Sequence, residues 1–409
     1  MNLRCRFCDT PLVQQFADLG MSPLSNAYLR PEQLDQMERF YPLTAYVCEQ
    51  CFLVQLPAVE TPENIFSDYA YFSSYSESWL AHARAYCEAM TQRLGLGASS
   101  QVVEIASNDG YLLQYFAGAG IPVLGVEPAA NVAEVARQKG IETLVRFFGV
   151  DTARELAAQN RHADLLLGNN VLAHVPDLND FVAGLKILLR DGGTITMEFP
   201  HLMRLMMGNE FDTIYHEHFS YFSLLTVRRV FAAHGLTIFD VDELPTHGGS
   251  LRIYARHAHE IDAPGDAVTR LEAEEREYGL ARIETYTRFA EQVRETKRAL
   301  LAFLIRAKEE GKRVASYGAP AKGNTLLNYC GIRTDFVEYT VDRSPHKQGL
   351  FLPGTHIPIY APDRIRETQP DYVLILPWNL KDEIVEQMSD VRSWGGRFVV
   401  PIPRVEVVE

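Results

Sequence analysis

The sequence predicts an α/β protein of three parts: an N-terminal four-cysteine zinc-binding domain followed by two doubly wound, Rossmann-like domains. Three observations support this prediction. Two Cys-x-x-Cys pairs lie near the N-terminus, short Val-, Ile- and Leu-rich runs alternate with helical stretches after residue 101, and the same alternation starts again after residue 311. Strands and helices that alternate at this spacing are typical of parallel sheets with helices on both faces.

The first part, residues 1–78, contains the pairs Cys5–Cys8 and Cys48–Cys51. A two-residue spacer lets each pair point two thiolates at one ion, so the four cysteines predict a structural zinc site. Four thiolates leave no open ligand position, which argues against a catalytic metal. Cys87 and Cys330 are expected to be ordinary buried thiols, because neither has a basic cluster beside it.

The second part, residues 79–263, opens with a strand and a turn of small residues, EIASNDG, and Glu127 ends the next strand. In doubly wound folds a small first turn admits a nucleotide, and an acidic residue about 20 positions later binds its ribose. The three-glycine fingerprint for a pyrophosphate is missing, so a cofactor without phosphates, S-adenosylmethionine, fits this turn. Generic strand-end acids, or a degenerate dehydrogenase, are the alternatives. The predicted cofactor contacts are Glu104, Ala106, Asn108, Gly110, Glu127, Asn169 and Asn170.

Residues 264–311 carry apolar side chains at positions 271, 278, 286, 289, 293, 300 and 304. These separations keep them near one helical face, so the segment predicts one long connecting helix with a charged, solvated side. Residues 312–409 then supply four further candidate strands and the Gly-rich turn GAPAKGN. The position of Lys322 in this turn does not match a triphosphate-binding loop. Backbone amides at a helix start, together with Lys322, are still expected to receive a diphosphate.

Net charge and hydropathy argue against two classes of partner, nucleic acids and membranes. The chain has 409 residues, with 39 basic and 53 acidic side chains and a net charge of −14. This balance, without a long basic run, argues against nucleic acid as the main partner. Apolar stretches fall short of the roughly 20 residues that cross a bilayer, and the N-terminus lacks the apolar core of a signal peptide. We therefore expect no membrane partner, a cytoplasmic protein, and a monomer or weak homo-oligomer.

Motifs along nearly the whole chain resemble one family, the S-adenosylmethionine-dependent sugar C-methyltransferases that act on nucleotide-linked keto-deoxysugars. The motifs are YAYFSSYSESW, EIASNDGYLL, GVEP, GNNVLAHVPD, IYHEHFSYFSL, THGGSLR, YGAPAKGNTLLNY, VDRSPHKQGLFLPG and LILPWN. The resemblance implies that the central part is a methyltransferase domain and that the C-terminal domain closes over a nucleotide sugar. It also implies methylation at C3 of a 4-keto-2,6-dideoxyhexose that bears deoxythymidine diphosphate or a similar nucleotide.

The segment YHEHFSY at residues 215–221 concentrates acid–base groups. A proton beside a ketone can be removed because the anion delocalises onto oxygen as an enolate, and a neutral imidazole is a suitable base near pH 7. If the segment is extended, alternation places Tyr215 and Glu217 on one face and His216 and His218 on the other. A metal pair or two satisfied core histidines are the alternatives. The resemblance selects His218 as the base, with Tyr215 and Glu217 in the same site.

Other site residues are expected on loops. The resemblance places Tyr69 as a phenol that assists enolate formation, whereas the alternative for its aromatic segment is a strip that only packs domains together. His174 follows the carboxyl end of a strand, where open α/β sheets place ligands; an exposed helix histidine is the alternative. The predicted substrate contacts are Tyr71, Phe72, Ser74, His201, Tyr221, His247 and Lys322.

Two other functions are considered. An NAD(P)-dependent nucleotide-sugar oxidoreductase would use one of the doubly wound domains, but the missing glycines count against it. A non-catalytic zinc-ribbon binding protein would retain the cysteines alone, and the intact Tyr-x-Glu-His series argues against that.

Overall fold

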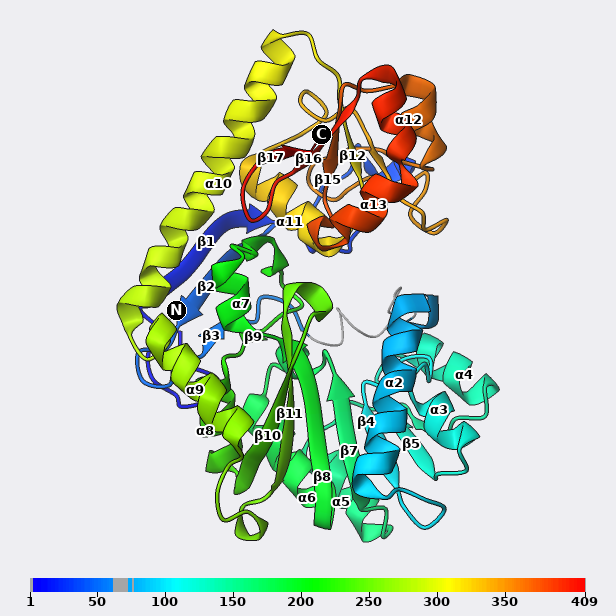
Figure 1. Cartoon of the computed structure of the whole chain (residues 1–409), viewed down its shortest axis with the longest axis vertical. Helices are drawn as coiled ribbons and strands as arrows, with labels where there is room; N and C mark the ends of the chain where they lie inside the picture. Colours follow the sequence, from blue (N-terminus) through cyan, green and yellow to red (C-terminus); the bar gives the residue numbers. More distant parts are fainter. Residues whose placement is uncertain (1–2, 62–72, 76, 409) are drawn as a thin grey trace.

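The computed structural model describes residues 3–61, 73–75 and 77–408, which form three sheets (Figure 1). The strand orders are β1-β2-β3-β9 in the N-terminal sheet, β10-β11-β8-β7-β4-β5-β6 in the central sheet, and β14-β13-β12-β15-β16-β17 in the C-terminal sheet. The predicted fold class, a zinc-binding domain with two doubly wound domains, is confirmed. Among the described residues, no helix is both long and apolar enough to cross a membrane.

The N-terminal sheet is antiparallel and is completed from far along the chain. It comprises β1 (Gln14–Ser22), β2 (Tyr41–Val47), β3 (Val54–Gln55) and β9 (Ser220–Tyr221). Because Val54 pairs with Tyr221, the strand that ends the YHEHFSY motif belongs to the sheet of the zinc-binding part. The motif is therefore fixed at one end to that sheet.

The central sheet is parallel through its first five strands. They are β4 (Val102–Ile105), β5 (Val123–Val126), β6 (Thr143–Leu144), β7 (Ala163–Asn169) and β8 (Leu189–Pro200). β11 (Ser250–His257) is antiparallel and lies between β8 and β10 (Leu236–Leu244). All four residues of β4 are buried, as expected for a parallel strand covered on both faces.

Helices cover this sheet, and short 3-10 turns follow several of its strands. The helices are α2 (Glu77–Leu94), α3 (Leu113–Gly118), α4 (Ala130–Gln138), α5 (Val150–Ala158), α6 (Leu178–Leu188), α7 (Leu202–Met207) and α8 (Leu224–Ala233). The 3-10 turns used below are η2 (Ser73–Tyr75), η3 (Leu172–His174), η4 (Phe211–Thr213) and η5 (Thr246–Gly248). The turns η3 and η4 and their flanking loops carry most of the predicted acid–base side chains.

The connecting segment forms two helices, so the expectation of one continuous helix is wrong. α9 (Asp266–Tyr278) ends at Gly279, whose φ of +105° is left-handed, and α10 (Ile283–Glu309) follows. A glycine in this conformation terminates a helix because it meets no Cβ clash. The predicted apolar face of α10 packs against β1, with the rings of Phe16 and Phe289 stacked 4.7 Å apart. The long helix thus rises along the N-terminal sheet toward the C-terminal sheet (Figure 1).

The C-terminal sheet is parallel except for its last strand. It contains β12 (Val314–Tyr317), β13 (Thr340–Val341), β14 (Ile359–Tyr360), β15 (Tyr372–Ile375), β16 (Arg397–Val400) and the antiparallel β17 (Glu406–Val408). Its helices are α11 (Ala321–Cys330), α12 (Asp363–Thr368) and α13 (Lys381–Gln387), and the 3-10 turn η7 (Trp378–Leu380) follows β15. The four strands expected from sequence correspond to β12, β13, β15 and β16, whereas the two edge strands β14 and β17 were not expected.

Candidate active site

The four N-terminal cysteines form one cluster, with all four Sγ atoms within 4.8 Å of one another. The Sγ atoms of Cys5 and Cys51 are 3.5 Å apart, and those of Cys8 and Cys48 are 3.4 Å apart. Tetrahedral zinc with Zn–S bonds of about 2.3 Å needs S···S separations of roughly 3.8 Å, so the cluster fits zinc. The Gln55 amide donates to Cys5 Sγ at 3.2 Å and orients that ligand.

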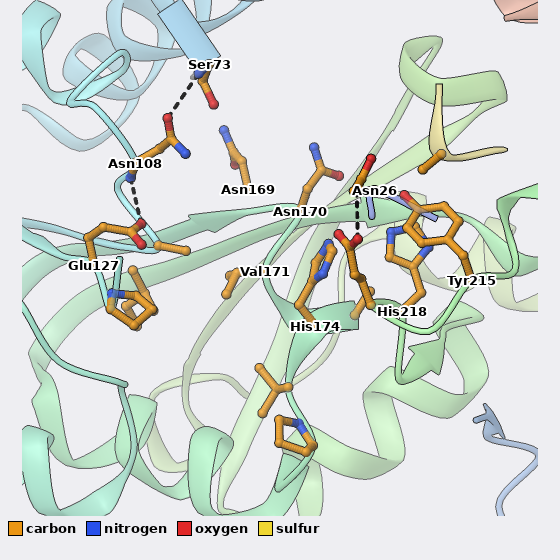
Figure 2. Close-up of a pocket in the computed structure, with 18 of the residues that line it drawn as sticks. Asn26, Ser73, Asn108, Glu127, Asn169, Asn170, Val171, His174, Tyr215 and His218 are labelled. Atoms are coloured by element: carbon orange, nitrogen blue, oxygen red, sulfur yellow. Dashed lines mark hydrogen bonds between the residues drawn. The ribbon is translucent and has the colours of Figure 1, made fainter. Parts of the chain in front are cut away.

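A cavity of about 860 Å³ lies where the three parts of the chain meet. Its floor is the carboxyl edge of the central sheet, where doubly wound folds place ligands. The loop Leu24–Tyr28 of the N-terminal part and residues 320–322 of the C-terminal part complete its walls. Figure 2 shows the wall from Ser73 and Glu127 at one end to Tyr215 and His218 at the other.

The first end, here called the cofactor end, comprises Ala106, Asn108, Glu127, Asn169 and Asn170, all of which line the cavity. The Glu127 carboxylate accepts the backbone N–H of Asn108 at 2.9 Å (Figure 2) and that of Ala129, also at 2.9 Å. Ala106 and Asn108 have left-handed φ values of 56° and 49°, which curl the first turn around this carboxylate. Burial raises the pKa of Glu127.

Two predicted cofactor residues lie outside the cavity wall. Glu104 is fully buried, and its pKa is raised by burial and by the nearby carboxylates of Glu127 and Asp109. Gly110 has a φ of +75°, and an added Cβ would lie 3.1 Å from Ile141 Cγ1. Glu104 thus sits in the interior behind the turn, and Gly110 lets the turn pack closely against its neighbours.

The second end is formed by residues 211–219, here called the acid–base loop. The segment is not extended, because the His218 N–H donates to the Tyr215 carbonyl at 2.9 Å and closes a turn, so the alternation considered for an extended backbone does not apply. This turn places the rings of Tyr215 and His218 4.1 Å apart, with Glu217 in the same cavity wall. His174 approaches from η3, with its ring 4.7 Å from that of His218. His216 lies outside the wall and donates through Nε2 to the Pro42 carbonyl at 3.2 Å.

Hydrogen bonds and burial influence the protonation of the side chains at the acid–base end of the cavity. His218 Nδ1 lies 3.0 Å from the Thr213 carbonyl oxygen, which only accepts, so Nδ1 carries the proton and Nε2 of the neutral ring is basic. Burial raises the pKa of Glu217 to about 7, although the Asn26 amide, which donates to it at 2.6 Å, opposes this shift. Burial lowers the pKa of His174 to about 4, so this imidazole is neutral near pH 7.

Of the other predicted residues, Lys322 lines the cavity and donates to Asn379 Oδ1 at 2.7 Å. Burial lowers the pKa of this lysine. Tyr221 lies behind His218, with ring centroids 6.0 Å apart, beside a small secondary void. Ser74 donates through Oγ to the Asp109 carboxylate and is not part of the cavity wall.

The structure does not bring His201 to the cavity. His201 is 1% exposed and hydrogen-bonds the buried Glu275 carboxylate through Nε2 at 2.7 Å, so this contact accounts for the polar side chain. Tyr69, Tyr71 and Phe72 lie outside the described residues. His247 belongs to η5 by its backbone, and its side chain is not among those described.

Comparison with known proteins assigns the family. Family models match residues 5–66 as a zinc binding domain, residues 79–241 as a methyltransferase domain and residues 245–403 as a C-methyltransferase C-terminal domain. C-methyltransferase NovU of Streptomyces niveus is 38% identical over 407 residues, which is 99% of this chain and 96% of NovU. The chain belongs to the S-adenosylmethionine-dependent C-methyltransferases. This assignment favours methyl transfer over the oxidoreductase and the non-catalytic alternatives.

Other similarities are more distant and cover less of the chain. Ubiquinone biosynthesis O-methyltransferase of a Chelativorans species is 31% identical over 117 residues, or 27% of this chain and 46% of that protein. Among solved structures, magnesium protoporphyrin IX methyltransferase of Synechocystis PCC 6803 with bound SAH is 17% identical in sequence, with a TM-score of 0.34. The match covers 44% of this chain and 81% of that protein's chain.

The cofactor end fits S-adenosylmethionine, because a buried carboxylate and three asparagines line its wall. The apolar surface beside them comes from Ile105, Val126, Pro128, Phe147 and Phe148. Polar groups that fix orientation within a mainly apolar wall are what small-molecule sites provide.

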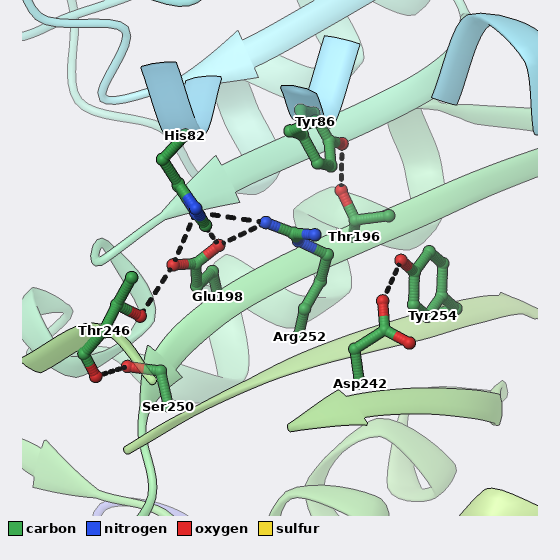
Figure 3. A network of polar contacts seen from close by, with 9 residues as sticks. All are labelled: His82, Tyr86, Thr196, Glu198, Asp242, Thr246, Ser250, Arg252 and Tyr254. Carbon is green, nitrogen blue, oxygen red and sulfur yellow. Dashed lines mark hydrogen bonds and ion pairs between the residues drawn. The ribbon is translucent and has the colours of Figure 1, made fainter. Parts of the chain in front are cut away.

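A polar network that sequence reasoning missed supports this wall (Figure 3). Glu198, at the end of β8, is fully buried between His82 of α2, at 3.0 Å, and Arg252 of β11, at 2.7 Å. His82 stacks on Trp79, which lines the cavity, with ring centroids 4.9 Å apart. The Glu198 carbonyl also accepts the N–H of Asn170 at 2.7 Å. The strand-end position of Glu198 was the one available signal for this network.

Proposed function

We propose that the chain transfers a methyl group to C3 of a nucleotide-linked 4-keto-deoxyhexose through an enolate, with His218 as the base. One observation carries this proposal. The basic Nε2 of His218, set by the Nδ1 hydrogen bond to Thr213, belongs to a ring that lines the same cavity as the cofactor end. A base, a methyl donor site and room for a sugar therefore share one space of about 860 Å³.

The cofactor end would hold S-adenosylmethionine through Asn108, Glu127, Asn169 and Asn170. When bound, this cofactor supplies an electrophilic methyl group. The chain contributes the buried carboxylate of Glu127, whose two oxygens are already aligned by backbone N–H groups. Such a preorganised carboxylate is suited to ribose hydroxyls.

The acid–base end handles one proton. His218 Nε2 takes the proton from C3, and the electron pair left behind delocalises onto the C4 oxygen. The phenol of Tyr215 lies beside this base and is suited to donate a hydrogen bond to that oxygen, whereas the neutral imidazole of His174 packs against the His218 ring. We further propose that Tyr69 contributes a second phenol.

The C-terminal part would receive the nucleotide diphosphate. Lys322 and Lys347 line the cavity from that part, and Lys322 lies in the first turn of α11. Cationic side chains and helix N-terminal amides together favour a phosphate group. Burial lowers the pKa of both lysines, so a bound diphosphate would favour their charged forms.

The experiment offers a small panel of nucleotide-linked 4-keto sugars with isotope-labelled S-adenosylmethionine and identifies the products by mass spectrometry. We expect one sugar to gain the label at C3. His218→Asn should lower kcat by about 100-fold to 10,000-fold, because a positioned base contributes that much. Its affinity for S-adenosylhomocysteine should not change.

His259→Asn is the matched control, because the side chain of His259 is 70% exposed, and this residue lies outside the cavity wall. Solvent deuterium should also enter C3 without the methyl donor in the wild type but not in His218→Asn. Near-normal turnover by His218→Asn would remove His218 as the base. A label found on oxygen or nitrogen would reject carbon methylation by this site.

A further inference from the structure

The acid–base loop is held by side chains from both outer parts of the molecule. Residues 214–219 lie outside helices and strands, so few backbone hydrogen bonds hold them, among them the turn closed by His218 N–H and the bond from Leu56 N–H to the Phe219 carbonyl at 3.0 Å. Catalytic groups nevertheless need orientation, since a misplacement of about 1 Å can cost roughly 100-fold in rate. Two side-chain contacts contribute to this orientation, one from the N-terminal loop Leu24–Tyr28 and one from the C-terminal part.

The N-terminal contact is made by Asn26. Its amide donates to Glu217 Oε1 at 2.6 Å, and Glu217 is 6% exposed (Figure 2). The preceding residue, Ser25, is itself fixed, because its carbonyl accepts the side-chain amide of Asn324 at 2.6 Å. Asn26 is thus anchored to α11 through its neighbour while it binds the carboxylate of Glu217.

The C-terminal contact is made by Trp378 of η7. Its indole N–H donates to Asp212 Oδ2 at 2.8 Å, and Asp212 is fully buried. The next residue, Thr213, carries the carbonyl that accepts the Nδ1 proton of His218. Trp378 is therefore one residue removed from the group that sets the tautomer and the orientation of His218.

We propose that Asn26 and Trp378 are positioning residues, through which the N-terminal and C-terminal parts orient Glu217 and His218 from opposite ends of the acid–base loop. For catalysis this inference rests on the proposed function. It assigns both outer parts a role in the proton transfer as well as in binding. The two residues act through Glu217 and Asp212, and the proton itself stays with His218.

The kinetic test uses the full-length zinc-loaded protein with Asn26→Ala and Trp378→Phe. Phenylalanine keeps an aromatic ring beneath the Lys322 ammonium, which lies 4.3 Å from the Trp378 ring, and removes only the N–H donor. We expect kcat to fall about tenfold in each variant, as the loss of one hydrogen bond to a buried carboxyl group would produce. The Kd for S-adenosylhomocysteine should stay unchanged, because the cofactor end is not altered.

Two controls remove equivalent contacts elsewhere. Asn179→Ala deletes an amide that donates to the Phe7 carbonyl at 2.9 Å, and Trp394→Phe deletes an indole N–H that donates to the Pro370 carbonyl at 3.1 Å. Neither contact involves the acid–base loop, so kcat should change by no more than about twofold. A tenfold loss in the controls as well would show a general effect on folding and would overturn the proposal.

Hydrogen-exchange mass spectrometry of the loop peptide provides a readout that needs no substrate. Amides of residues 211–219 should exchange faster in Asn26→Ala and Trp378→Phe than in either control. If the wild type methylates a keto sugar but both variants match the controls in kcat, the positioning role is wrong while the proposed function stands. If no keto sugar is methylated, the proposed function fails. Unchanged hydrogen exchange of residues 211–219 in both variants would independently reject the positioning role of Asn26 and Trp378.

Discussion

The two ends of the cavity are built in different ways. The cofactor end comes mainly from the central α/β unit, whose wall residues, such as Asn108, Glu127 and Asn169, lie at or just after the carboxyl ends of strands. Ser73, from outside that unit, donates its backbone N–H to Asn108 Oδ1 at 3.0 Å. The acid–base end combines the loop that carries His218 with contacts from both outer parts of the chain, including Asn26. We therefore expect cofactor binding to depend mainly on the central sheet, and the proposed proton transfer to depend on contacts from all three parts of the chain.

The largest expected effect comes from loss of the zinc site, which should abolish methyl transfer but leave cofactor binding intact. The double substitution of Cys48→Ser and Cys51→Ser removes two of four zinc ligands, and structural zinc contributes roughly 10 to 16 kcal/mol to folding. The N-terminal part should unfold and release Asn26 from Glu217, so methyl transfer should fall by more than about 1,000-fold. Affinity for S-adenosylhomocysteine, measured by calorimetry, should stay within about threefold, because the cofactor end lies in the central part.

A chelated wild-type sample provides the control for this prediction. Adding zinc back should restore methyl transfer to the wild type but not to the double variant, with metal content followed by atomic absorption. Loss of cofactor binding in parallel with activity would mean that the two ends are not separable.

The second prediction concerns a substitution that should weaken cofactor binding and leave proton removal unchanged. Glu127→Ala removes the carboxylate that accepts two backbone N–H groups and lines the cofactor end. We expect the Kd for S-adenosylhomocysteine to rise about 100-fold, a loss typical of charged hydrogen bonds. Deuterium uptake at the sugar carbon without methyl donor should continue near the wild-type rate, because His218 is untouched. Glu127→Gln, which keeps the shape of the side chain, distinguishes lost charge from a collapsed turn.

Sequence reasoning succeeded where the site is local. The strand–turn–helix pattern around Glu104 and Glu127 predicts the central fold, and the cysteine spacing predicts the metal cluster, because each depends on residues close in sequence or on a fixed ligand geometry. The turn that brings Tyr215 and His218 together was missed, since alternation assumes an extended backbone. Asn26 carried no signal, because its role depends on how a distant loop docks on the central part.

A smaller effect is expected in the wall of the cofactor end (Figure 3). His82→Phe keeps a ring that can stack on Trp79 and removes the contact to Glu198, which retains Arg252 as its partner. Since His82 is only partly buried, the loss should raise the Kd for S-adenosylhomocysteine by about threefold, with kcat unchanged. Tyr254→Phe is the control, because its hydroxyl binds Asp242 on the same sheet. A large loss of kcat would place this network at the acid–base end instead.

The smallest effect concerns the folded state near the acid–base loop and depends on pH. Burial and the neighbouring Asp212 carboxylate raise the pKa of Glu210 to about 8, and Glu210 is 7% exposed. Because the unfolded chain ionises this group near its ordinary value, its contribution to stability is fully present in acid and is lost as pH rises toward 8. Glutamine mimics the protonated form, so Glu210→Gln should match the wild type at pH 4.5.

At pH 8.5 the same variant should melt about 3–5 °C higher, because it avoids burying a charge. Calorimetry at both pH values checks this, with the exposed Glu134→Gln expected to shift the melting temperature little at either pH. A rise of equal size at pH 4.5 would attribute the effect to packing and not to ionisation. Methyl transfer should change little, since Glu210 lies outside the cavity wall and precedes the residues that orient His218. The acid–base end would then carry a buried charge that costs stability without taking part in the chemistry, whereas the cofactor end uses the buried charge of Glu127 to bind its ligand.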